Sequence, residues 1–103
     1  MELTIAERLL LLTVLPAQGD LLTIRIVRQL REDLSFTEQE IAEHDITTHE
    51  GGRITWESET LKTVEIGAKG REIIGAVLAK LDADGKVEER FLSLFDKFGV
   101  GAA

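Results

Sequence analysis

The chain contains no cysteine and no tyrosine, and it has only one proline and one tryptophan. The lack of cysteine excludes disulfide bonds and thiolate metal sites, and it fits a reducing compartment. The apolar stretch Leu9–Leu12 is too short for a membrane span or a signal-peptide core, and Met1–Thr4 carries no base. We therefore expect a soluble, cytoplasmic protein without a membrane partner.

The length and composition are those of one small domain. Of the 103 residues, 44% are hydrophobic, which is enough to bury one core without covalent staples. The sequence shows no internal repeat and no low-complexity segment. We expect a single helical domain over residues 1–99, followed by a flexible tail at 100–103.

Five segments carry apolar residues at the 3.6-residue spacing of amphipathic helices. These predicted helices cover about 5–14, 22–34, 36–44, 68–81 and 87–98. Thr4 begins a capping box of the form Thr-x-x-Glu, and the same signature begins at Ser35 and again at Thr37. Pro16 ends the first helix, and Gly99 suits the C-cap of the last one.

Between the third and fourth helices the periodicity changes to that of strands. Arg53–Trp56 and Leu61–Ile66 alternate polar and apolar residues around a polar turn at 57–60. We interpret them as the two strands of a central antiparallel β-hairpin at about 53–66. The predicted fold class is α+β and mostly helical, in the order α-α-α-β-β-α-α, which is like the order of a winged helix.

The negative charge of the chain is concentrated in its middle third. Residues 34–66 hold eight acids and two bases, a net charge of −6, whereas residues 1–33 and 67–103 have net charges of −1 and 0. The three values add up to the −7 of the whole chain. A one-sided charge of this kind restricts which partners can dock there.

The winged-helix order raises DNA binding as an alternative function, that of a DNA-binding regulator. The helix that would enter the major groove, at 37–44, holds three acids and no lysine or arginine. Because DNA binding depends on neutralising phosphates, such a helix would meet like charge in the groove. We do not expect a nucleic-acid partner.

Our main hypothesis is a non-enzymatic protein-binding module. Its acidic surface, at 37–65, would dock on a basic partner such as a nucleic-acid-binding or defence protein, since charge sets association rate and specificity. The candidate partner-binding residues are Glu38, Glu40, Glu43, Asp45, Glu57 and Glu59.

Arg25, Arg28 and Arg31 form the one basic cluster of the chain. They could bind a small anionic ligand, which gives a second alternative function, or they could hold an acidic partner. We favour a third role, in which they pair with the acidic third helix within the fold.

Catalytic and metal-binding motifs are scarce. None of the three serines lies in a Gly-x-Ser-x-Gly setting, and no P-loop or dinucleotide fingerprint is present. Asp82–Val87 resembles the middle of a calcium loop, but Phe91 stands where that loop needs a bidentate glutamate. His44 and His49 do not share a helical face. We expect no enzyme activity, no metal and no cofactor.

Three segments carry a resemblance to small proteins encoded by phages and prophages. They are Leu22–Glu40, Gly52–Trp56 with Val64–Gly67, and the helix pair that ends in Leu92–Phe98. The proteins that it resembles are uncharacterised, so the resemblance implies a phage context and a host-cell cytoplasm but no site residues. Small acidic phage proteins often act by occupying a host protein.

Two apolar surfaces suggest self-association. Leu9–Leu12 is apolar on all sides, and the fourth helix carries a wide stripe that includes Ile73, Ile74 and Val77. A lone domain of this size would have difficulty covering both surfaces. We therefore expect a homodimer.

Overall fold

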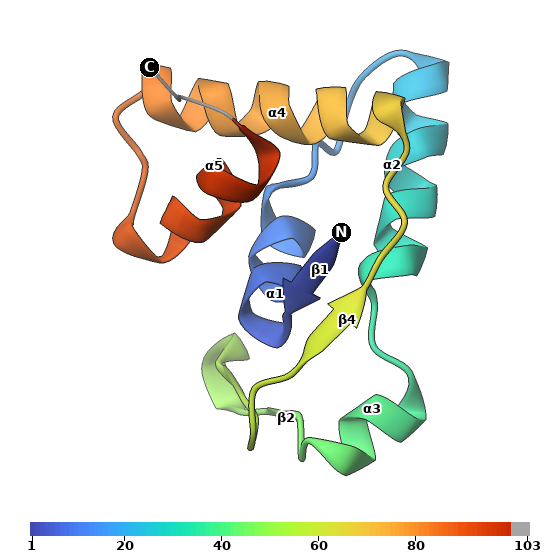
Figure 1. Ribbon diagram of the computed structural model, residues 1–103, viewed down its shortest axis with the longest axis vertical. Coiled ribbons are helices and arrows are strands. Elements are labelled where there is room, and N and C mark those ends of the chain that lie inside the picture. The colour runs from blue at the N-terminus through green and yellow to red at the C-terminus, as the bar shows by residue number, and fades with distance from the viewer. Residues whose placement is uncertain (100–103) are drawn as a thin grey trace.

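The structure is a computed structural model, and it describes residues 1–99 (Figure 1). Two 3₁₀ turns, Glu50–Gly52 and Glu89–Phe91, accompany the helices and strands. In chain order, the helices and strands are β1 (Glu2–Thr4), α1 (Ile5–Val14), α2 (Leu21–Leu34), α3 (Glu38–Glu43), β2 (Thr47–Thr48), β3 (Ile54–Thr55), β4 (Leu61–Thr63), α4 (Ala68–Ala83) and α5 (Leu92–Phe98).

The five predicted helices are confirmed; α1 has the predicted ends, the ends of α2, α3 and α4 differ by one or two residues, and α5 begins five residues later than predicted. α1 begins at the capping box of Thr4, and the α3 capping box is the one at Thr37. Ser35 instead caps the C-terminus of α2, where its N–H donates to the Arg31 carbonyl. α5 is shorter than predicted because residues 89–91 form a 3₁₀ turn, and Gly99 ends it in the left-handed conformation with φ of 66°.

The α+β, mostly helical class with a small antiparallel hairpin is confirmed, but the strand pairing predicted for 53–66 is wrong. β3 pairs with β2, in the register Thr48↔Ile54, and β4 pairs with the N-terminal β1, in the register Leu3↔Lys62. Gly51 and Gly52, with φ of 86° and 83°, allow the tight turn that closes the β2–β3 hairpin. The sequence had predicted no strand at residues 2–4.

The polar segment at 57–60 is not a hairpin turn, and this explains the different pairing. The Glu57 N–H donates to the His44 carbonyl at 2.7 Å, which ties the segment back to the end of α3. Ser58 adopts a φ of 57°, which redirects the chain. The chain then reaches β1 rather than folding back on β3.

The core surrounds α1, which lies near the middle of the molecule (Figure 1). α2 packs along α1, α4 runs across one end of the molecule and contacts α2, and α5 packs under α4. The most deeply buried apolar side chains come from β1, α1, α2, α4 and α5, which makes this one continuous core. They are Leu3, Ile5, Leu11, Leu34, Ile74, Leu78 and Leu94.

Candidate functional site

Arg8 anchors the acidic helix α3 to the core. Its side chain is fully buried, and its Nη1 donates to Glu40 Oε2 at 2.6 Å. Its Nε donates to the Leu34 carbonyl at 3.1 Å and its Nη2 to the Ser35 carbonyl at 2.7 Å. The guanidinium also stacks 4.0 Å from the centre of the Phe36 ring. One side chain of α1 therefore fixes both the end of α2 and the position of α3.

Glu40 makes structural contacts within the fold, and its role as a partner-binding residue stays a prediction. Its carboxylate accepts from Arg8 and lies 3.3 Å from Lys62 Nζ. The hydrogen bond from Arg8 lowers the pKa of Glu40 to about 2 against the opposing effect of burial. Glu40 is thus ionised and already paired within the fold.

Glu59 also makes a structural contact, and its role as a partner-binding residue likewise stays a prediction. Its carboxylate accepts from the N–H of Ile5 at 2.6 Å and lies 3.4 Å from the N–H of Ala6. These are amides of the first turn of α1, which have no partner inside the helix. Glu59 therefore caps a helix that lies 54 residues earlier in the chain.

The remaining predicted acids stay exposed around α3 and the loops that adjoin it. The Ile46 N–H donates to the Ile41 carbonyl, and the loop beyond β3 is tied to His44, so both loops are held against the C-terminal end of α3. Arg53 is the one exposed base between residues 38 and 57. We define the acidic surface as Glu38, Glu43, Asp45, Glu50 and Glu57, all exposed.

The basic cluster on α2 does not pair with α3, so that expectation is wrong for the described residues. Arg28 lies 3.8 Å from Glu32 of the same helix. Arg31 reaches back to the carbonyls of Leu12 and Leu15 at 3.4 and 3.5 Å. The arginine that pairs with α3 is Arg8, a buried residue of α1. Arg28 instead lies near an acid of its own helix, and Arg31 contacts the end of α1.

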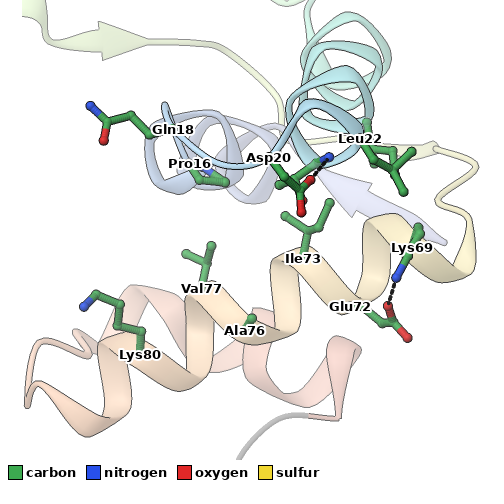
Figure 2. Close-up of a pocket in the computed structure, with 12 residues that line it drawn as sticks. Pro16, Gln18, Asp20, Leu22, Lys69, Glu72, Ile73, Ala76, Val77 and Lys80 are labelled. Atoms are coloured by element: carbon green, nitrogen blue, oxygen red, sulfur yellow. Dashed lines mark hydrogen bonds and ion pairs between the residues drawn. The ribbon is translucent and has the colours of Figure 1, made fainter.

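An apolar groove of about 430 Å³ lies between α4 and the segment that leads into α2 (Figure 2). Ile73 and Val77 of α4 point into it from one side, and Pro16 and Leu22 close it on the other. Leu22 is apolar, but 58% of its surface is exposed. The groove is an apolar surface that the chain leaves uncovered.

A second cavity, of about 550 Å³, lies between α1, the β2–β3 hairpin and the start of α5. Trp56, Arg53 and Arg90 line it, with Glu7 beneath them. Glu7 is buried and its Oε1 accepts from Lys97 Nζ at 2.6 Å.

Glu7 is held as a carboxylate inside the fold. Burial raises the pKa of Glu7, but hydrogen bonds from Lys97 and the Thr4 amide outweigh it, so the pKa lies below its usual value. Ser93 lowers the pKa further, although Glu7 Oε2 makes no hydrogen bond of normal geometry within residues 1–99. Glu7 thus joins α1 to α5 through Lys97.

A third groove, shallow and of about 450 Å³, runs between β4 and α3. Leu61, Lys62 and Thr63 form one wall, and Glu40 and Glu43 belong to the other. This groove adjoins the acidic surface.

His44 lines the third groove, whereas His49 and the Asp82–Val87 turn lie outside all three grooves. His49 Nε2 lies 2.6 Å from Thr55 Oγ1 across the β2–β3 hairpin, and Gly85 takes a φ of 68° at the end of α4. Within residues 1–99, no three histidine, aspartate or glutamate side chains are grouped to hold a metal ion. In the same range no helix has the length and apolar character to cross a membrane.

Comparisons with protein-family models, curated proteins and solved structures give no match to this chain.

Sequence reasoning overlooked Arg8, Glu7 and Lys97. A signal for the first two was present, because Glu7 and Arg8 interrupt an otherwise apolar first helix. Charged residues at such positions are rarely buried unless they are paired. The identity of their partners could not be read from the sequence, since Glu40 and Lys97 lie 32 and 90 residues away.

Proposed function

We propose that the protein is a non-enzymatic binding module that docks its acidic surface on a basic protein, in a phage context. The single observation that carries the proposal is that five exposed acids lie between residues 38 and 57, on α3 and in the loops and hairpin that follow it, with one exposed base among them. Arg8 fixes the position of α3, so Glu38 and Glu43 are presented on an anchored helix, and backbone hydrogen bonds tie the loops that carry Asp45 and Glu57 to the C-terminal end of α3. A rigid charged surface loses little entropy on binding and steers association.

The contact would be made by acids that the fold does not use. Neutralising Glu40 or Glu59 would disturb the fold as well as the surface, so these two residues are unsuitable for a test. Glu38, Glu43, Asp45 and Glu57 are exposed, and their side chains form no ion pair within residues 1–99. The surface can therefore be altered without removing a structural contact.

The test is affinity capture from a bacterial lysate with the immobilised protein. We expect the variant Glu38→Gln/Glu43→Gln/Asp45→Asn/Glu57→Gln to lose the captured protein, and the wild type to lose it as salt is raised, because exposed charges are screened. A matched variant neutralises four exposed acids elsewhere that form no ion pair within residues 1–99, at Glu2, Asp82, Glu89 and Asp96. Equal capture by wild type and both variants would rule out the acidic-surface proposal.

We propose separately that the α2–α4 groove is the contact of a homodimer. Leu21 and Leu22 beside it are 68% and 58% exposed. The lysines on α4 are paired within the helix, Lys69 with Glu72 at 3.1 Å and Lys80 with Asp84 at 3.8 Å. Because both lysines are paired with acids, a second copy of the same apolar surface could pack here without leaving a lysine charge uncompensated.

A further inference from the structure

β4 (Leu61–Thr63) has one paired edge and one open edge. The Val64 N–H donates to the Met1 carbonyl at 2.8 Å, and the Met1 ammonium donates to the Val64 carbonyl at 3.0 Å, so these two residues form a hydrogen-bonded pair. Hydrogen-bonded pairs alternate with non-hydrogen-bonded pairs along an antiparallel ladder. The pair Leu3↔Lys62 is therefore also hydrogen-bonded, so the N–H and C=O of Lys62 are directed at β1. Leu61 and Thr63 therefore direct their backbone groups away from β1.

The open edge faces the groove between β4 and α3. β1 occupies the other side of β4, and in Figure 1 α3 lies across the gap from β4. Within residues 1–99 the N–H groups of Leu61 and Thr63 donate to no atom outside the β1–β4 ladder. The groove thus combines an unpaired strand edge with a volume of about 450 Å³ beside it.

The shape of this groove fits an extended peptide. Two outward N–H and two outward C=O groups on a three-residue strand are the pattern that an added strand recognises. Leu61 is 55% exposed, so it offers apolar contact to alternate side chains of that strand. A shallow groove of this kind suits a peptide better than an enclosed small molecule.

The charge of the groove favours a basic peptide. Glu43 lines the α3 wall, and Glu38, Asp45 and Glu57 extend the negative charge beyond it. Lys62 and Arg8 share the single carboxylate of Glu40, so the negative charge that favours a basic segment comes from Glu43 and from the three acids beyond the groove.

We propose that an extended segment rich in lysine or arginine, belonging to the partner protein, adds as a third strand to the open edge of β4. The strand order would become partner–β4–β1, with the basic side chains along α3. This inference rests on the proposed function and states how the acidic surface engages its partner.

The test uses three synthetic peptides and the full chain. The first peptide alternates lysine and valine over six residues. The second has the same sequence with a methyl group on every backbone amide nitrogen, which keeps the charge but leaves neither edge of the peptide able to donate to β4. The third replaces lysine with glutamate. Binding is followed by fluorescence anisotropy, and the contact is located by NMR shifts of the Leu61 and Thr63 amides.

We expect the first peptide to bind, the N-methylated peptide to bind about tenfold more weakly or worse because it lacks two or three hydrogen bonds, and the acidic peptide not to bind. The protein variant Thr63→Pro should also lose the first peptide. Its N–H faces outward, and proline is tolerated at such an edge position. If Thr63→Pro is misfolded, the N-methylated peptide on wild-type protein still decides the question.

The outcomes separate this inference from the proposed function. Equal binding of the plain and N-methylated peptides, both weakened by the four-acid variant, would overturn strand addition and leave acidic-surface docking intact. Peptide binding that moves amides of α2 and α4 instead would overturn the inference as well. Absence of peptide binding together with partner capture that depends on the four acids would overturn strand addition alone.

Discussion

At the residue scale, Arg8 is the side chain on which the acidic end of the molecule depends. Its charge is fully buried, and it is balanced by one carboxylate, two backbone carbonyls and an aromatic ring. Removing one partner of a buried ion pair leaves the other charge uncompensated, which costs more than the pair itself contributes. The acidic helix therefore keeps its place only while Glu40 is ionised.

We expect Glu40→Gln to lower the free energy of unfolding by about 3 kcal/mol at neutral pH. Glu43→Gln, on the exposed side of the same helix, is the matched control and should change it by less than about 0.5 kcal/mol. Urea unfolding of both variants measures the difference. Equal stability of the two variants would contradict the structural role of Glu40.

The same pair predicts an acid dependence of stability. The pKa of Glu40 is lowered from 4.5 to about 2 in the fold. A lowered carboxyl pKa stabilises the fold above the unfolded pKa, so this stability is present above about pH 4.5 and is lost as the pH falls towards 2. Glu7 contributes with the same sign. Unfolding free energies measured from pH 7 to 3 should fall less steeply for Glu40→Gln than for wild type.

At the scale of secondary structure, the N-terminus of α1 is capped twice. Thr4 supplies the local capping box, and Glu59 supplies a carboxylate from the loop between β3 and β4. The carboxylate also lies at the positive end of the helix dipole, which favours it there. This contact holds the long segment after the hairpin against the body of the protein.

We expect Glu59→Ala to lower the free energy of unfolding by about 1 kcal/mol, the usual loss for a helix cap. Glu57→Ala removes an exposed acid from the same segment and is the control. The shift in the urea midpoint of each variant measures the loss. If both variants shift the midpoint equally, the effect is one of net charge and not of capping.

At the scale of the whole molecule, one of the two apolar surfaces that were expected to need a partner, the Leu9–Leu12 run, is covered within the fold. Leu10 and Leu11 are buried and Leu9 and Leu12 partly so, which means that the apolar run of α1 needs no partner. The stripe of α4, by contrast, borders the open α2–α4 groove. The proposed dimer therefore depends on α2 and α4 alone.

Sedimentation velocity should give a species of twice the 11.4 kDa chain mass. Leu22→Gln should convert it to monomer, while Leu92→Gln should not, because Leu92 is similarly exposed at 54% but lies on α5 away from the groove. Neither variant should be destabilised, since both side chains face solvent. A monomer for the wild-type chain at all concentrations would end the dimer proposal.

The sequence by itself determined the helices. The boundaries of α1 follow from apolar periodicity, from the capping residue Thr4 and from Pro16, and the extent of α2 follows from its apolar periodicity; these signals act within a few residues. The sequence also determined where negative charge is concentrated, and from this we judged DNA binding unfavourable. These features are local, so they could be read without the fold.

Only the tertiary structure decided the strand pairing and the use of individual acids. β4 and β1 pair across 57 to 61 residues, and alternation of residue types shows that a strand exists but not which strand it meets. Glu40 and Glu59 looked like their exposed neighbours in the sequence. Their partners, Arg8 and the first turn of α1, come close only when the chain folds, because hydrogen bonds and buried charges are satisfied in space and not along the chain.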